Sequence, residues 1–125
     1  MLLGVWVVCA GSLSAYEATD ADDSVERFLS QHCHDCHGSS KPKADFQHEL
    51  LSLDFDDDNN RQQWQLVLEQ IKSGKMPPKE KPLPEVSETR RVGDWISERV
   101  SDAEIKQNTM QGRVVLRRLA STQPI

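Results

Sequence analysis

Cysteine, positive charge and long apolar runs are all scarce in this sequence, and each scarcity excludes a class of protein. Only three cysteines occur in 125 residues, too few for a small scaffold held together by several disulfides. The net charge of −5 argues against a nucleic-acid partner or an anionic membrane surface. No apolar run is long enough to cross a bilayer comfortably, so we expect no integral membrane span.

The longest apolar stretch lies at the N-terminus, from Leu2 to Leu13. Its length suits the core of a secretory signal peptide, and the small residue Ala15 offers a cleavage site. We therefore predict a signal peptide over about residues 1–15 and export to the periplasm or an equivalent extracytoplasmic space. One feature departs from the usual pattern, because no Lys or Arg precedes Arg27 to give the leader a positive start.

The two cysteines beyond this leader belong to a C-x-x-C-H motif, spelled CHDCH over residues 33–37. Two thiols at this spacing can add across the vinyl groups of a haem, and the histidine that follows then reaches the iron. The motif predicts one covalently attached haem c, held by Cys33 and Cys36, with His37 as an axial ligand. A backbone carbonyl would orient the other ring nitrogen of His37, and Pro42 is a candidate for it.

A second iron ligand is predicted from the segment GKMPP at residues 74–78. A thioether sulfur is a common sixth ligand of haem iron and raises the reduction potential. Pro77 fixes its own φ and restricts the residue before it, so the backbone of Met76 is stiff. We expect Met76 to be the sixth ligand, and the alternatives are Met110, in a polar segment, and His48.

Four lysines gather within a short segment around the predicted sixth ligand: Lys72, Lys75, Lys79 and Lys81. Only one acid, Glu80, lies among them, which leaves a local excess of three positive charges. If Met76 binds iron, these lysines surround the haem crevice. We expect a redox partner protein to dock near them, because long-range attraction speeds encounter without adding much affinity.

Hydrophobic periodicity predicts an all-α chain with three main helices. The periodic segments cover residues 23–32, residues 61–73 and residues from about 85 onwards. Asp23 resembles the N-cap of the first helix, and the acidic run 54–58 is expected to cap the second. Gly93 costs the third helix about 1 kcal/mol relative to Ala. A close crossing, with the first helix as the expected partner, would offset that cost.

Several of these segments together resemble one known family. They are Phe28-Leu29, residues 33–38, residues 41–45, Trp64, residues 74–78 and residues 94–96. They look like the planctomycete-type cytochrome c domain, which opens large exported bacterial proteins, and the resemblance covers roughly residues 25–100. It implies a class I cytochrome c-like fold, with three main helices around a covalently attached haem and with His37 and Met76 as axial ligands.

The resemblance also suggests how the chain is organised. A cytochrome c-like haem domain is expected over residues 20–107, after the signal peptide. Residues 112–119 look like the opening of the domain that follows in this family, and the pattern departs after Leu119. Residues 108–125 are therefore expected to form a linker and the truncated start of another domain, in the N-terminal part of a longer protein.

We interpret the chain as a monohaem electron-transfer module and not as an enzyme itself, although such a module can form part of a larger enzyme. One alternative is a small structural zinc domain. Its ligands would be Cys33, Cys36, His37 and one of His32, His34 or His48. A third reading, redox exchange between the two cysteines, would require a βαβ context, and the sequence contains no convincing strands.

Overall fold

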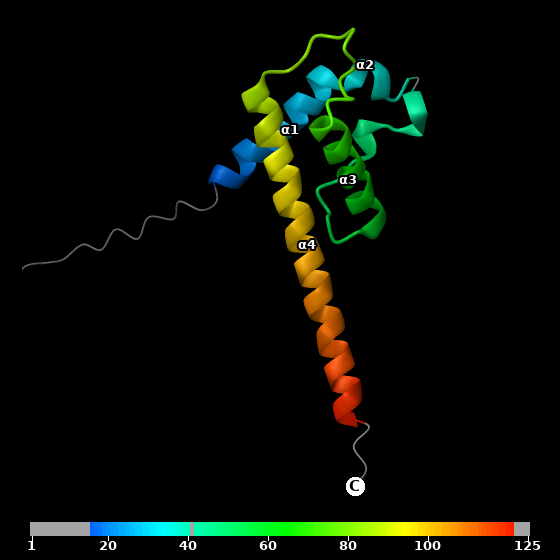
Figure 1. The fold of residues 1–125 in the computed structure, drawn as a ribbon, viewed down its shortest axis with the longest axis vertical. Helices are drawn as coiled ribbons and strands as arrows, with labels where there is room; N and C mark the ends of the chain where they lie inside the picture. The colour runs from blue at the N-terminus through cyan, green and yellow to red at the C-terminus, as the bar shows by residue number, and fades with distance from the viewer. Residues whose placement is uncertain (1–15, 41, 122–125) are drawn as a thin grey trace, which may run out of the picture.

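Helices account for the regular structure of this chain in its computed structural model, which describes residues 16–40 and 42–121 (Figure 1). The elements, in chain order, are α1 (Tyr16–His32), α2 (His34–His37), η1 (Lys43–Asp45), η2 (His48–Leu50), α3 (Asp58–Lys72) and α4 (Val86–Ser121), where η1 and η2 are 3-10 turns. No strand occurs in these described ranges. The predicted all-α fold is confirmed. The predicted signal peptide lies outside the described residues.

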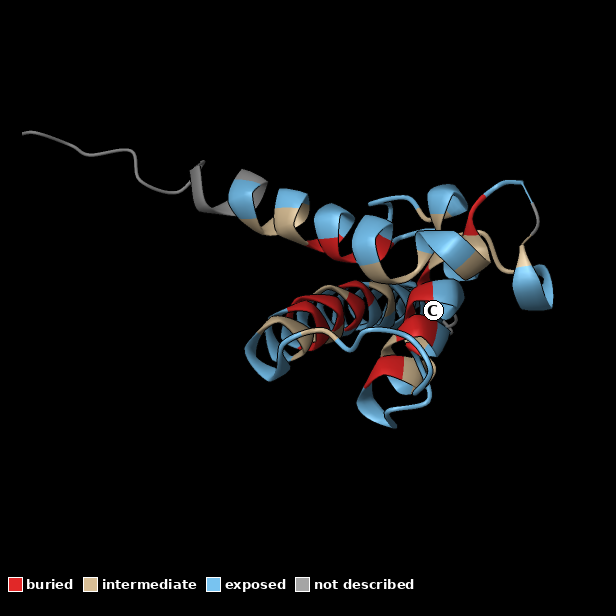
Figure 2. Ribbon diagram, turned by 90° about the horizontal axis from the view of Figure 1, so that it is seen from above, coloured by how far each residue is buried: buried red, intermediate tan, exposed pale blue. Residues whose placement is uncertain are grey.

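The core lies where α4 packs against both α1 and α3. Buried positions line the facing sides of these three helices, while their outer faces are exposed (Figure 2). Each helix contributes one of the largest fully buried side chains, Phe28, Trp64 and Ile96. Trp64 also stacks on Phe55, at 5.5 Å between ring centroids, and meets the Trp95 ring edge to face at 5.4 Å. These aromatic contacts tie the loop before α3 to α3 and α4.

The bounds of α3 follow the local signals in the sequence. Asp57 is the N-cap, and its side chain accepts a hydrogen bond of 2.7 Å from the backbone N–H of Asn60, as expected of the acidic run. The helix ends before Gly74, whose φ of 70° lies in the left-handed region that glycine adopts without steric cost.

The first helix begins earlier than predicted, at Tyr16 instead of after Asp23. The periodic pattern starts near Val25 because that is where the helix becomes buried, which is not where it begins. Asp22 has a role that periodicity does not signal. Its Oδ1 accepts hydrogen bonds from Trp95 Nε1 at 3.1 Å and from Arg99 at 2.8 Å, joining α1 to α4.

The helix α4 is a single element that passes through residue 108 without a break. Its second half extends past the rest of the molecule (Figure 1), and the apolar side chains there are exposed: Met110, Val114, Val115, Leu116 and Leu119. The proposed boundary between two domains therefore falls inside a helix, and the division itself stays a prediction. Within the described chain, no helix combines the length and apolarity needed to cross a membrane.

The expected partner of Gly93 was α1, and this prediction is wrong. The atoms nearest to a Cβ built on Gly93 belong to α3, namely Leu68 Cδ1 at 3.8 Å and Lys72 Cε at 4.0 Å. These are ordinary van der Waals distances. The crossing of α3 and α4 therefore does not require a glycine at this position.

Candidate functional site

The C-x-x-C-H motif forms one tight turn at the end of α1. The N–H of Cys33 donates to the carbonyl of Leu29 at 2.9 Å, which continues the hydrogen bonding of α1. The N–H groups of Cys36 and His37 both donate back to the carbonyl of Cys33, at 3.3 and 2.9 Å. Both cysteines are half-buried free thiols. The turn therefore places two sulfurs and an imidazole on one short segment, as the motif requires.

One cavity, of about 190 Å³, brings the four predicted site residues together: Cys33, Cys36, His37 and Met76. Its lining comes from the end of α1, from α2 and from the segment after α3, and this segment passes close to α2 in the ribbon of Figure 1. Much of the remaining lining is apolar, including Phe28, Ile71 and Pro77. A second cavity, of about 410 Å³, shares Ile71, Met76 and Pro77 with it and reaches α4 at Gly93. Met76 therefore lines both cavities.

The His37 ring is held by two backbone carbonyls. Its Nδ1 lies 3.0 Å from the carbonyl oxygen of Lys43 and 3.2 Å from that of Phe46. Because a carbonyl oxygen can only accept, Nδ1 carries the proton and Nε2 keeps a free electron pair for a metal. The prediction of Pro42 as the orienting carbonyl is wrong, and Lys43 and Phe46 take that role.

A turn of unusual backbone geometry aims both carbonyls at the same ring. Between them, Ala44 and Asp45 have φ angles of 56° and 53°, in the left-handed region that side chains other than glycine rarely adopt. The Phe46 ring also packs edge to face on His37, at 5.2 Å between centroids. The turn therefore fixes the tautomer and the plane of the imidazole together.

The loop that contains this turn is anchored on α3. The Asn60 side chain accepts from Ser52 N–H at 2.9 Å and donates to the carbonyls of Ser52, at 2.9 Å, and Asp54, at 2.7 Å. Trp64 Nε1 donates to the same Ser52 carbonyl at 2.9 Å. The position of the loop beside α2 therefore depends on two α3 side chains that do not line the cavity.

Met76 is placed by the way α3 ends. The N–H groups of Lys75 and Met76 both donate to the carbonyl of Gln70, at 3.1 and 3.2 Å, after the left-handed turn at Gly74. The Met76 side chain lines the cavity and remains 37% exposed. The two prolines after Met76 prevent the helix from continuing. Met76 is instead held against the last turn of α3 by its backbone hydrogen bond.

The environment of the cavity affects the Cys33 thiol. Burial, and secondly the neighbouring Cys36, raise the pKa of Cys33 to about 11. At neutral pH the Cys33 thiol is therefore protonated, and thiol–disulfide exchange requires the thiolate. This environment argues against the reading of the pair as a redox disulfide centre.

The four lysines lie in different settings. Lys81 lines the cavity, and its Nζ is 3.6 Å from an Asp35 carboxylate oxygen. Lys72 donates to Ser97 Oγ on α4 at 3.2 Å. Lys75 and Lys79 are exposed. The positive segment therefore borders the cavity, although only Lys81 takes part in its lining.

The other sequence candidates lie elsewhere. Met110 is on the exposed half of α4. His48 is on η2 beside His34, and burial lowers its pKa, partly offset by Glu49. His32 lies 3.6 Å from Glu88. Among the described residues, His34, His48 and Glu49 have ligand atoms close enough together to hold a metal ion. This group contains none of Cys33, Cys36 and His37, on which the predicted zinc site is built.

A family comparison covers this site. Residues 33–80 match the planctomycete cytochrome C family, a range that begins at Cys33 and includes His37 and Met76. No curated protein and no solved structure matches the chain significantly. The match implies covalently attached haem c as the cofactor and favours it over zinc. It also supports a role in electron transfer. Residues 33–80 of this chain therefore belong to a planctomycete-type cytochrome c domain.

Proposed function

We propose that this domain carries single electrons through one haem c, attached at Cys33 and Cys36, with His37 and Met76 as axial ligands. The observation that carries the proposal is one cavity lined by all four side chains, three from the C-x-x-C-H turn and one from the segment after α3. The donor set fits the cofactor, since it combines two free thiols, an imidazole with an available Nε2, and a thioether.

Each residue has a distinct task in this proposal. Cys33 and Cys36 would hold the haem, each free S–H adding across one vinyl double bond so that the sulfur bonds to one carbon and the hydrogen to its neighbour. When bound, the haem supplies an iron that changes its charge by one electron. His37 donates from Nε2 while the two carbonyls keep its Nδ1 protonated. The Met76 thioether favours the reduced state, and the apolar lining limits contact with water.

In this proposal, the lysines near Met76 form the surface on which a redox partner docks. Lys75 and Lys79 are exposed, and Lys81 borders the cavity. Positive charge at the place where electrons enter and leave would attract a redox partner with an acidic surface. The chain thereby acts as an electron-transfer module and does not itself catalyse a reaction.

The same proposal places the protein outside the cytoplasmic membrane. Cytochrome c domains are typically exported, and the apolar stretch from Leu2 to Leu13 has the length of a signal-peptide core. A larger exported protein that begins with this domain is the setting that the sequence resemblance suggests.

The test begins with protein exported from a host that matures c-type cytochromes. After denaturation and acid–acetone extraction, the haem should remain with the polypeptide, because thioether bonds survive both treatments. A colourless protein after competent maturation would refute the proposal. Elemental analysis on the same sample distinguishes iron from zinc.

The sixth ligand is tested separately with Met76→Ala. This variant should alter the native visible spectrum and lower the reduction potential, because the thioether that favours reduced iron is lost. Met110→Ala is the matched control, since Met110 lies on the exposed half of α4, and its spectrum should equal that of the unmodified protein. Equal spectra for both variants would remove Met76 from the ligand set.

A further inference from the structure

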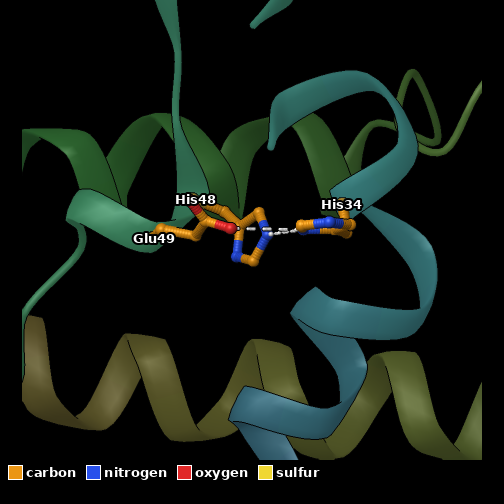
Figure 3. Close-up of side chains that lie close together, drawn as sticks. All are labelled: His34, His48 and Glu49. Carbon is orange, nitrogen blue, oxygen red and sulfur yellow. Dashed lines mark hydrogen bonds and ion pairs between the residues drawn. The ribbon is translucent and has the colours of Figure 1, made fainter. Parts of the chain in front are cut away.

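A second group of ligand-type side chains lies outside the cavity that gathers the cysteines. His34, on α2, faces His48 and Glu49, on η2, across a short gap (Figure 3). His34 Nδ1 is 3.1 Å from His48 Nε2 and 3.4 Å from Glu49 Oε1. One donor atom from each residue lies within 4.8 Å of the other two. None of the three lines the cavity of Cys33 and Cys36.

These distances suit a tetrahedral metal centre. Zinc binds imidazole nitrogen and carboxylate oxygen at about 2.0–2.1 Å, which places neighbouring ligand atoms about 3.3 Å apart in a tetrahedron. The separations of His34 Nδ1 from His48 Nε2 and from Glu49 Oε1, 3.1 and 3.4 Å, are close to that value. The third separation, between the ligand atoms of His48 and Glu49, is within 4.8 Å. It can be adjusted by rotation of the Glu49 side chain, which is 40% exposed.

The His34 ring is held in place by its surroundings. A Cβ on Gly38 would come within 2.9 Å of the ring atom Cε1 and within 3.0 Å of Nδ1, so the ring lies directly against the Gly38 backbone. The N–H of Gly38 also donates to the carbonyl of His34 at 2.8 Å. The absence of a side chain at Gly38 therefore makes room for the ring beside η2.

The surroundings favour a cation. His34, His48 and Glu49 border a larger cavity, of about 760 Å³, whose lining also includes the acidic residues Asp23 and Glu26 of α1. With two neutral imidazoles and one carboxylate as ligands, a divalent ion keeps a net positive charge that these acids can partly balance. The cavity also gives water access to a fourth coordination position.

We propose that His34, His48 and Glu49 bind a divalent transition-metal ion of the Zn²⁺ type, with the fourth position open to the cavity. Two imidazoles select such ions over Mg²⁺ and Ca²⁺, which prefer oxygen ligands. This inference does not depend on haem binding, because it uses none of the four residues assigned to haem.

The experiment titrates Zn²⁺ into the haem-loaded full chain by calorimetry at neutral pH, since haem attachment removes both thiols as competing ligands. One zinc per chain is expected, with no displacement by excess Mg²⁺ or Ca²⁺. His48→Gln and Glu49→Gln should each weaken binding at least about tenfold, because even losing a hydrogen-bond partner of a ligand costs about 10- to 100-fold.

Two controls match the substitutions. His32→Gln removes a histidine that contacts Phe28 and Glu88, and Glu69→Gln removes an exposed carboxylate of α3. Both should keep the affinity of the unmodified chain. The double variant Cys33→Ser/Cys36→Ser, which cannot attach haem, should also bind one zinc, so a failure of haem loading does not stop the test. Absence of zinc binding, or equal affinity in the His48 and Glu49 variants, would overturn the proposal.

Discussion

Replacing Gly93 with alanine should stabilise the fold. Glycine in a helix interior costs about 1 kcal/mol relative to alanine, and Gly93 lies buried in α4. The new methyl group would meet Leu68 Cδ1 at 3.8 Å and Lys72 Cε at 4.0 Å, so it gains contacts without a clash. Burial of that group contributes up to about 0.8 kcal/mol more. The expected gain in the free energy of unfolding is therefore about 1–2 kcal/mol.

Urea denaturation of the full chain measures this gain. With a slope of about 1–3 kcal/mol per molar urea for a domain of this size, the midpoint should rise by several tenths of a molar unit or more. Gly112→Ala is the matched control. It lies inside the same helix with no atom within 4 Å of the new Cβ, so it can gain helix propensity but no packing contact, and its midpoint should rise less than that of Gly93→Ala.

The two variants must be compared with the unmodified chain in the same state of haem loading, because Gly93 borders the cavity next to Met76. A fall in the midpoint for Gly93→Ala would mean that α3 and α4 approach more closely than the 3.8 Å contact states. The reasoning about this helix crossing would then be refuted.

Three other predictions follow from the core, the thiols and the surface charge. Phe28→Ala removes a fully buried ring and should cost about 3–5 kcal/mol, measured by thermal or urea unfolding; a loss below about 1 kcal/mol would contradict the packing. The pKa of Cys33 is raised from 9.0 to about 11. The haem-free chain should therefore lose stability as pH rises from about 9 to 11, and Cys33→Ser should flatten that decline in unfolding free energy. Reversing the charge at Lys75 and Lys79 should slow electron transfer from an acidic partner about tenfold at low salt, while Arg113→Glu on the far half of α4 should not. Equal rates at all ionic strengths would exclude steering by these lysines.

Local signals in the sequence were enough to predict the elements that depend on local chemistry. The N-cap at Asp57 and the glycine at residue 74 bound α3, because capping depends on residues within one turn. The start of α1 was mispredicted because Asp23 has the side chain of a cap, while the helix in fact begins at Tyr16. A periodic pattern marks the buried part of a helix and not its full length.

Features that depend on tertiary proximity could not be read from the sequence. Ala44 gives no sign of the left-handed backbone that it adopts, so the sequence assigns the carbonyl that orients His37 to the wrong residue. Hydrophobic periodicity likewise predicts that the helix face at Gly93 is buried, but it does not indicate which helix packs against that face. The grouping of His34 with His48 and Glu49 arises only when the loop folds back on α2. In contrast, the shared cavity of Cys33, Cys36, His37 and Met76 agrees with a grouping predicted from the chemistry of haem attachment.

The long exposed half of α4 has a consequence for how order is distributed along the chain. Ala103 is the last buried residue of this helix, and the backbone then continues to Ser121, a distance of roughly 27 Å at 1.5 Å per residue. An isolated helix of that length is marginal in water because its first turn is costly to form. The packed half of α4 supplies that first turn, so helicity spreads outward from it. Backbone amide exchange should therefore quicken steadily from Ala103 toward Ser121, as a gradient along one helix and not as a step between two rigid bodies.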